Sequence, residues 1–463
     1  MKFAKNLIAA GLSVAALFVG QSANAISYGT DVSSSDYQDW IVHIKVTNAS
    51  GGYNVCGGAL VGTKYILTAA HCVGDIVNSS PRTYNYFVDQ DADNTITVTN
   101  AVSASDTDHS YDRTYSITEL GDTDTMYAAY DSVYTALSAD VDSSLQLSEA
   151  SESDFNTYAN RDLVLLTLNE EVPHSTQAIL TPMIDVDSAS ANVPYGASIT
   201  VQGWGANEDG SLQDTLQVTT EQNDMFQKTV SKVFGETNSG DEVDCAVGTA
   251  DDCTLWYRDY VEISANSTTG ALALSGDSGT PLVYNGRYIG NLSTVSTTEN
   301  YNTFTFLDYY MDQIRDAINA VVYPTSVDHA VSSGSTSTFT ISVPVQNFTS
   351  SSVSLYPSLS TDSSVISASI GGTCEGATLS TEEGCAVTIT VDSDNTAITS
   401  AQTATLSLND DNDTTIPISV SIASTSNSSS DSSDSGSSGG GSFGIWSLLF
   451  MAVPALRRFK SNK

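Results

Sequence analysis

Three short segments, far apart in the chain, constrain the fold more than any other feature of the sequence. Thr68 to Cys72 contains a histidine, Asn160 to Leu166 contains an aspartate, and Gly276 to Pro281 contains a serine between glycines. Two further segments keep the same order along the chain, since Cys56 to Leu60 precedes the first and Gln202 to Gly205 lies between the second and the third. Each segment alone is a modest signal, but the five in this order are highly specific.

The residue types in these segments suit nucleophilic catalysis. A serine hydroxyl is a weak nucleophile until a neutral imidazole within hydrogen-bond distance takes its proton, and the imidazole needs a buried carboxylate that fixes its tautomer. Ser278, His71 and Asp162 supply these three groups. An esterase with the same groups is a weaker alternative, because it normally carries its serine in a G-x-S-x-G turn of an α/β sheet.

Taken together, the five segments resemble those of the trypsin-like (chymotrypsin-fold) serine endopeptidases, over nearly all of residues 26–320. The resemblance implies a chymotrypsin-like double β-barrel and cleavage of protein or peptide substrates through an acyl-enzyme. It implies Ser278 as nucleophile, His71 as general base and then acid, and Asp162 as the residue that orients the histidine. The alternative is a surface binding or adhesive protein that keeps this fold with an inactive site.

The resemblance also implies residues that support the triad. The backbone N–H groups of Gly276 and Ser278 would form the oxyanion hole, and Cys56 would pair with Cys72 beside the histidine. No cofactor is required for this chemistry.

Activation is predicted from the start of the mature chain. In this family a new N-terminal isoleucine inserts into the domain, and its ammonium pairs with the aspartate that precedes the nucleophile. Here Ile26 directly follows Ala25, which ends a small-x-small pattern typical of a signal peptidase site. We therefore predict that removal of the signal peptide frees Ile26 to pair with Asp277, so that no separate propeptide is needed.

The predicted specificity pocket departs from the trypsin pattern. Leu272 stands where trypsins carry the aspartate that receives Lys or Arg, and Ser293 and Val295 belong to a segment that replaces Ser-Trp-Gly. A Leu floor and a Val wall cannot pair a cation, and burying an unpaired cation is costly. We therefore expect cleavage after small or medium apolar residues.

Composition and targeting segments indicate an exported chain. The 16 Lys and Arg against 54 Asp and Glu give a net charge of -38, which argues against a nucleic-acid partner because the phosphate backbone is bound by basic groups. Residues 1–25 have the basic start and apolar run of a signal peptide. Residues 426–440 form a Ser/Asp/Gly linker.

The last segment, residues 441–463, resembles the GlyGly-CTERM sorting tail of Gram-negative bacteria. The resemblance implies transient retention in the inner membrane, cleavage by a rhomboid-type protease, and type II secretion to the cell surface or the medium. An ordinary C-terminal anchor is the alternative, although the apolar run is shorter than a comfortable membrane span.

The rest of the chain is predicted to be mostly β. Residues 26–322 read as short strands with one helix, Tyr309 to Val321, near the end. The clearest of the predicted strands are 40–46, 163–168, 198–202 and 281–284. Residues 323–425 alternate Thr, Ser and Val, which favours a small Ig-like β-sandwich.

The cysteines and the acidic insert leave alternatives open. Six cysteines allow 15 connectivities, and their spacing favours three local disulfides in an exported protein, Cys56 with Cys72, Cys245 with Cys253 and Cys374 with Cys385. The segment between the histidine and the aspartate is acidic. Within it Asp89, Asp91 and Asp93 are candidate ligands for a structural calcium ion, and a solvated acidic loop is the alternative.

Overall fold

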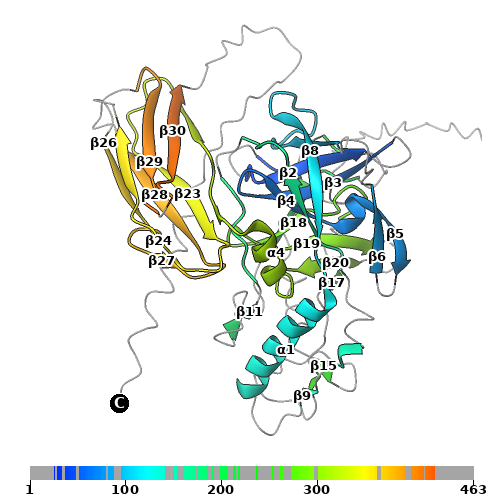
Figure 1. The fold of residues 1–463 in the computed structure, drawn as a ribbon. Helices are drawn as coiled ribbons and strands as arrows, with labels where there is room; N and C mark the ends of the chain where they lie inside the picture. The colour runs from blue at the N-terminus through cyan, green and yellow to red at the C-terminus, as the bar shows by residue number, and fades with distance from the viewer. Residues whose placement is uncertain are drawn as a thin grey trace, which may run out of the picture.

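The computed structural model shows a mostly β protein with two barrel-forming sheets and a C-terminal sandwich (Figure 1). The structure describes residues 26, 29–33, 37–47, 52–79, 82–87, 95–140, 147–148, 151–153, 161–173, 176–182, 184–185, 190–191, 199–206, 212–214, 217–218, 236–237, 253–254, 260–264, 273–296, 301–361, 367–392, 398–410 and 412–422. The predicted signal peptide, linker, sorting tail and calcium ligands lie outside these residues, as do Leu272 and Cys245.

Six strands close the first barrel, in the order β10-β4-β3-β2-β7-β8. Their bounds are β2 Ile41–Thr47, β3 Tyr53–Val61, β4 Tyr65–Thr68, β7 Thr95–Thr99, β8 Ser110–Glu119 and β10 Val164–Leu168. Alternate residues of β2 are buried toward its end, and β10 is an almost continuous apolar run, so the inner faces of these strands fill the barrel. The predicted strands at 40–46 and 163–168 match β2 and β10 within a residue.

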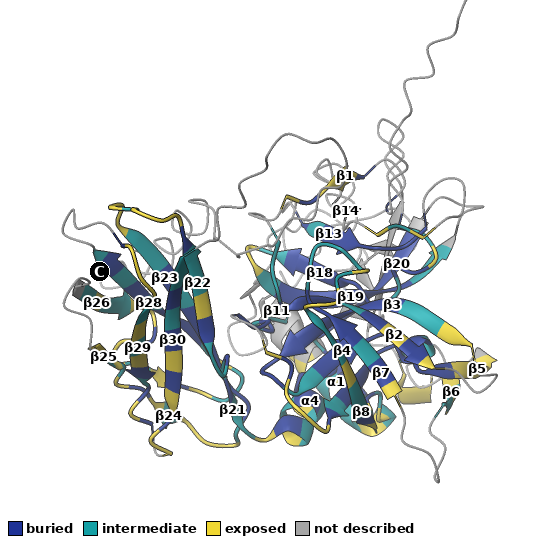
Figure 2. Cartoon of the chain, turned by 90° about the horizontal axis from the view of Figure 1, so that it is seen from above, coloured by how far each residue is buried: buried dark blue, intermediate teal, exposed yellow. Residues whose placement is uncertain are grey.

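Seven strands form the second sheet, in the order β1-β14-β13-β18-β19-β20-β17. Their bounds are β1 Thr30–Asp31, β13 Thr200–Gly203, β14 Gln217–Val218, β17 Tyr260–Ser264, β18 Pro281–Tyr284, β19 Arg287–Ser296 and β20 Tyr301–Phe306. Both sheets contribute to a single core of buried apolar residues (Figure 2). The expected mostly β, double-barrel architecture is confirmed.

Two described helices accompany the barrels. The helix α4, Met311–Ile318, is shorter than predicted because Asn319 adopts the left-handed conformation at φ 43° and ends it. The helix α1, Thr123–Asp140, was not predicted and lies within the acidic insert. Its first turn is capped by Asp122, which accepts a hydrogen bond from the Thr125 N–H at 3.1 Å.

The helix α1 is held by two fully buried side chains one turn apart, Met126 and Tyr130. The Tyr130 ring meets Tyr309, just before α4, edge to face at 6.2 Å between centroids. This helical spacing was not recognised in the sequence, because the residues around it follow the pattern of short strands.

Smaller sheets decorate the barrels. The hairpin of β5 (Gly74–Ser79) with β6 (Arg82–Tyr86) follows β4 and the turn that contains His71. The others are β11 (Ile184–Asp185) with β12 (Ser190–Ala191), and β15 (Glu236–Thr237) with β16 (Cys253–Thr254) and β9 (Leu147–Ser148).

Two four-stranded sheets form the C-terminal sandwich, in the orders β21-β23-β28-β26 and β22-β30-β29-β25, with β24 and β27 as a separate pair. Their bounds are β21 Val321–Val322, β22 Val327–Val331, β23 Phe339–Asn347, β24 Val353–Ser354, β25 Ser358–Thr361, β26 Ser367–Gly372, β27 Thr378–Leu379, β28 Gly384–Asp392, β29 Gln402–Ser407 and β30 Thr415–Ile422. The sandwich has its own buried core, which includes Cys374 and Cys385. Its first strand begins two residues before the predicted boundary at residue 323.

The sandwich is joined to the barrels by buried hydrogen bonds. The Gln346 side chain accepts from the Leu180 N–H at 2.9 Å and donates to the Leu180 carbonyl at 2.8 Å. From the barrel side, Gln177 Nε2 donates to the Val322 carbonyl at 2.9 Å. Phe348, on the sandwich side, belongs to the core shared by the barrels. These contacts make one continuous structure of the two regions.

Replacing Gln346 with Leu should lower the free energy of unfolding by about 2–4 kcal/mol, because it leaves the buried N–H and C=O of Leu180 without partners. Urea denaturation checks this. Gln402→Leu is the matched control, since the Gln402 side chain bonds locally to Ser400, two residues away, and its loss should change the midpoint little. Equal urea midpoints for Gln346→Leu and Gln402→Leu would contradict the proposed contribution of Gln346 to stability.

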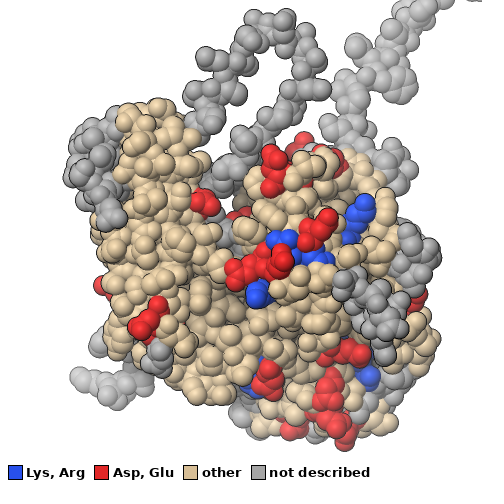
Figure 3. All heavy atoms as spheres, turned by 45° about the horizontal axis from the view of Figure 1, so that its top comes forward, with Lys and Arg blue, Asp and Glu red and all other residues tan. Residues whose placement is uncertain are grey.

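The charge is carried unevenly. On the face shown in Figure 3, acidic side chains cover more of the surface than basic ones and gather over the barrels, whereas the sandwich is mostly uncharged. Within the described residues, no helix is long and apolar enough to cross a membrane.

Candidate active site

His71 lies on a short 3-10 turn, Ala70–Cys72, directly after β4. A disulfide ties this turn to the middle of β3, because Cys72 is bonded to Cys56. The turn therefore has little freedom to move relative to the first barrel.

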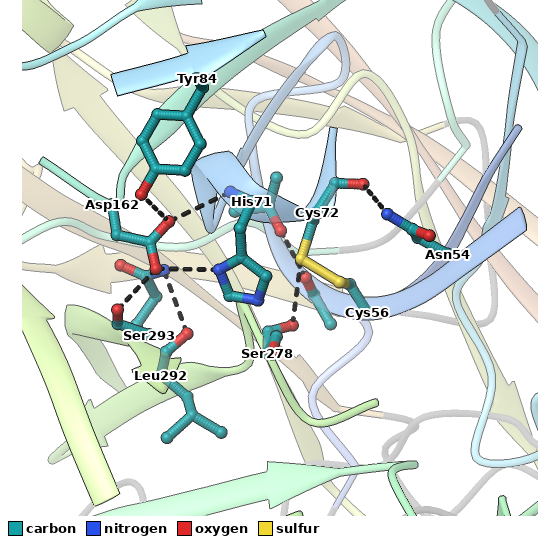
Figure 4. Close-up of a disulfide and its surroundings, with 12 residues drawn as sticks. Asn54, Cys56, His71, Cys72, Tyr84, Asp162, Ser278, Leu292 and Ser293 are labelled. Carbon is teal, nitrogen blue, oxygen red and sulfur yellow. Dashed lines mark hydrogen bonds and ion pairs between the residues drawn. A yellow bond between two sulfur atoms is a disulfide. The ribbon is translucent and has the colours of Figure 1, made fainter. Parts of the chain in front are cut away.

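Asp162 is brought to His71 by strand pairing. In the antiparallel pair of β10 and β4, Val164 lies opposite Thr68. The residue two places before Val164 therefore falls beside the turn that follows Thr68. The Asp162 carboxylate accepts a hydrogen bond from the His71 backbone N–H at 3.1 Å and bonds to Nδ1 of the ring at 2.9 Å (Figure 4).

Ser278 comes from the second sheet, in the turn before β18. Its carbonyl oxygen accepts a hydrogen bond from the Gly57 N–H at 2.8 Å and lies 3.7 Å from the Cys72 sulfur. In Figure 4 Ser278 lies on the side of the His71 imidazole away from Asp162. The three segments of the sequence thus meet where the two barrels face each other.

The turn that holds Ser278 depends on glycine. Gly276 and Gly279 have φ of 100° and 77°, a region that other residues rarely adopt. A Cβ at Gly279 would stand 2.5 Å from the Gly57 carbonyl oxygen. The serine can therefore approach β3 only because its neighbour has no side chain.

Asp277 is fully buried beneath this turn. Its carboxylate accepts hydrogen bonds from the Gly205 N–H at 2.7 Å and the Leu274 N–H at 2.9 Å. The carboxylate presses on Gly203 and Gly205, where any Cβ would fall within 2.5 Å of it. Burial raises the pKa of Asp277 to about 7, and no ion pair to it occurs among the described residues. Ile26 is also fully buried, in the core of the barrels.

Electrostatics support an ionised Asp162 beside His71. Although burial opposes its charge, His71, Arg82 and the Ser293 hydroxyl hold the pKa of Asp162 well below its ordinary value. Burial disfavours protonation of His71, but the charge of Asp162 and the hydrogen bond to it leave the pKa of His71 above its ordinary value. An ionised carboxylate only accepts, so the neutral ring carries its proton on Nδ1 and leaves Nε2 as an acceptor.

The residues predicted to line the specificity pocket lie in different surroundings. Ser293 is fully buried and its hydroxyl donates to Asp162 at 2.5 Å. Val295 is half-buried on β19, opposite Asn302 of β20. Leu272 is outside the described residues.

Two residues of the site, Arg82 and Tyr84 on β6, were not predicted from the sequence. Tyr84 Oη donates to Asp162 at 2.8 Å, and Arg82 approaches the same carboxylate at 3.4 Å. The only signal in the sequence was the alternation of Arg82, Tyr84 and Tyr86, which indicates one face of a strand but not what that face covers.

Two of the three predicted disulfides are present, Cys56 with Cys72 and Cys374 with Cys385. Cys253 lies on β16, and its predicted partner Cys245 is outside the described residues.

Comparisons with known proteins give one family match and several similar solved structures. The family model described as Trypsin matches residues 27–147 and 135–318. Among solved structures, the secreted serine protease VesC from Vibrio cholerae is similar with 14% identity and a TM-score of 0.34, over 85% of this chain and 71% of that one. The VesB protease from Vibrio cholerae matches with 16% identity and a TM-score of 0.34, over 86% of this chain and 99% of that one. No curated protein matches in sequence. The family model covers more than half of the chain, which therefore belongs to the trypsin family.

Proposed function

We propose that this protein is a secreted serine endopeptidase with Ser278 as nucleophile, His71 as general base and acid, and Asp162 as the orienting carboxylate. The observation that carries the proposal is the meeting of three distant segments at one point, with a buried Asp162 on Nδ1 of His71 and Ser278 on the other side of the ring. Membership of the trypsin family adds protein or peptide as the substrate class.

The geometry suits acyl transfer in two steps. Ser278 Oγ attacks the scissile carbonyl carbon while Nε2 of His71 takes its proton, and the positive ring is stabilised by Asp162. The N–H groups of Gly276 and Ser278 receive the oxyanion. His71 then gives its proton to the leaving amine, and water activated by the same ring releases the acyl group from Ser278.

Substrate preference and activation belong to the same proposal. We take Leu272 and Val295 to favour a small or medium apolar residue before the scissile bond. We take the ammonium of Ile26, freed by cleavage after Ala25, to pair with Asp277. The buried Asp277 with its raised pKa supports this pairing, because an uncompensated carboxylate there is costly.

The proposal of export rests on two segments of the sequence, residues 1–25 and 441–463. We propose that residues 1–25 direct secretion and that the tail 441–463 holds the protein at the inner membrane of a Gram-negative cell until a rhomboid-type protease releases it for type II secretion. The enzyme would then act at the cell surface or in the medium.

The decisive experiment compares residues 26–426 with the Ser278→Ala variant on a mixed peptide library, with products identified by mass spectrometry. Cleavage by the wild type alone, after Ala, Val or Leu, is the expected result. Labelling of Ser278 by a serine-directed fluorophosphonate checks the nucleophile independently of substrate choice. If neither protein cleaves and Ser278 is not labelled, an inactive binding protein becomes the better explanation.

A further inference from the structure

The hairpin of β5 and β6 covers the carboxylate of the triad. Along β6, Arg82, Tyr84 and Tyr86 are half-buried while the two residues between them are exposed. Since alternate residues of a strand share a face, these three side chains all turn inward. That face lies over Asp162, which has no exposed surface.

Arg82 places a positive charge on the oxygen that serves the histidine. Its Nη1 lies 3.4 Å from Oδ2 of Asp162, and Nδ1 of His71 lies 2.9 Å from the same atom. The same Nη1 donates to the Ser293 hydroxyl at 3.3 Å. The Arg82 side chain is only 20% exposed, so its charge is partly shielded from solvent screening.

Tyr84 holds the other oxygen of the carboxylate. Its hydroxyl donates to Oδ1 of Asp162 at 2.8 Å, and its ring stacks on Tyr86 at 5.9 Å between centroids. With the contacts from His71 and Ser293, five donors surround one carboxylate. Such a carboxylate has one orientation available, because rotation would break several of these bonds together.

We propose that Arg82 and Tyr84 are positioning residues of the triad, with Tyr84 fixing the Asp162 carboxylate and Arg82 setting the basicity of His71 through its charge. This inference rests on the proposed function, because it assigns the two residues a role in the same reaction. Neither residue belongs to the segments that carry the family resemblance.

The direction of the effect follows from the charges around the ring. A neutral His71 is the active base, and a nearby guanidinium disfavours the protonated ring, so Arg82 keeps more of the base available at low pH. Among the described groups that face the pair, Asp162 acts in the opposite sense and Ser293 is neutral. Burial raises the pKa of Tyr84 and of Tyr86, so both stay neutral, and Glu119 of β8 adds to the effect on Tyr86.

The test is the pH dependence of kcat/KM. Arg82→Gln should move the acid limb upward by about 0.5–1 pH unit, since it removes a positive charge close to the ring. Activity at pH 5.5 should fall about 3- to 10-fold relative to wild type, with little change at pH 8.5. Arg82→Lys keeps the positive charge, so its acid limb should lie close to that of the wild type. Arg113→Gln is the matched control. It removes the same positive charge, but from a side chain on β8 that donates to the Glu171 carbonyl and not to Asp162.

Tyr84→Phe separates orientation from charge. It keeps the ring and removes one donor to Asp162, so kcat should fall about 3- to 10-fold while the acid limb moves less than in Arg82→Gln. An acid limb that is the same in wild type and Arg82→Gln, or that moves equally in Arg113→Gln, would overturn the role of Arg82. Unchanged kcat in Tyr84→Phe would overturn the role of Tyr84.

A measurement without turnover keeps this inference apart from the proposed function. The pKa of His71 is followed by NMR in the Ser278→Ala background, with and without Arg82→Gln. A higher pKa of His71 in the double variant supports the charge effect even if no substrate is ever cleaved. Failure of the wild type to cleave peptides or to react with the fluorophosphonate would instead count against the proposed function alone.

Discussion

Replacing Asp162 with Asn should reduce kcat by about 10⁴-fold at neutral pH. An asparagine offers one oxygen and one NH2 group to a site in which every neighbour donates. Its NH2 group therefore faces either the His71 backbone N–H and Tyr84, or Nδ1 of His71 together with Arg82 and Ser293. The imidazole is then favoured with its proton on Nε2, where it cannot accept from Ser278. Steady-state kinetics on the best peptide of the library measures the loss.

The matched control for this substitution is Asp214→Asn. Asp214 also accepts bonds from a hydroxyl and a backbone N–H, Ser103 Oγ at 2.7 Å and Ser105 N at 2.8 Å, and these bonds do not involve His71. It should keep kcat within about 3-fold of wild type, since its contacts are exposed. Comparable losses of kcat in Asp162→Asn and Asp214→Asn would mean that Asp162 acts only by stabilising the fold. Circular dichroism of each variant would then show a loss of folded structure.

A chain that keeps one alanine before Ile26 should lose about 10²- to 10³-fold in kcat, the range expected when donors of an oxyanion hole are misplaced. Its Ile26 nitrogen is an amide, so the buried Asp277 has no ammonium partner and its pKa stays near 7. Without that ion pair, the turn from Gly276 to Ser278 is less firmly held in the conformation that forms the oxyanion hole. Active-site titration of the two forms, one beginning at Ile26, measures the difference.

The same pair of proteins should differ in how stability depends on pH. Because the pKa of Asp277 is raised to about 7 when folded and lies near 3.8 when unfolded, the folded form holds the proton more tightly. In the blocked chain the contribution of Asp277 to stability should therefore be greatest below about pH 4 and fall by about 3–4 kcal/mol as the pH rises to 7. In the form that begins at Ile26, an ion pair would remove this loss.

Asp277→Asn provides the control for that pH trend. In the blocked chain it should remove the part of the fall in melting temperature between pH 4 and 7 that comes from Asp277, because residue 277 then has no carboxyl to ionise. Identical pH profiles for the blocked and the free chain would refute the pairing of Ile26 with Asp277.

The sequence was sufficient for the double-barrel fold and the segments that meet at the site. Short motifs such as Gly276 to Pro281 are read directly, because a turn of this kind tolerates only particular residues. The boundaries of β2, β10 and β18 were predicted within a residue or so, since their apolar runs are bounded by turn residues.

Contacts between residues far apart in the chain could not be predicted from the sequence. Nothing in the pattern around residues 123–140 showed that Met126 and Tyr130 would find a buried face to pack against. Arg82 and Tyr84 are separated from Asp162 by about 80 residues, so only the fold brings them to it. Ser293 was assigned to the pocket by its motif, while its hydroxyl is committed to the carboxylate.

The joint between the barrels and the sandwich has a consequence for how the enzyme would meet its substrates. In both ribbon views the β5–β6 hairpin, which covers Asp162, lies at the end of the molecule away from the sandwich (Figures 1 and 2). Because Gln346 and Gln177 fasten the two regions through buried bonds, the sandwich cannot swivel freely as a tethered module would. A surface bound to the sandwich would consequently leave the β5–β6 hairpin, with Asp162 beneath it, on the side away from that surface. Under the proposed function, the geometry of attachment would then decide which neighbouring chains come within reach.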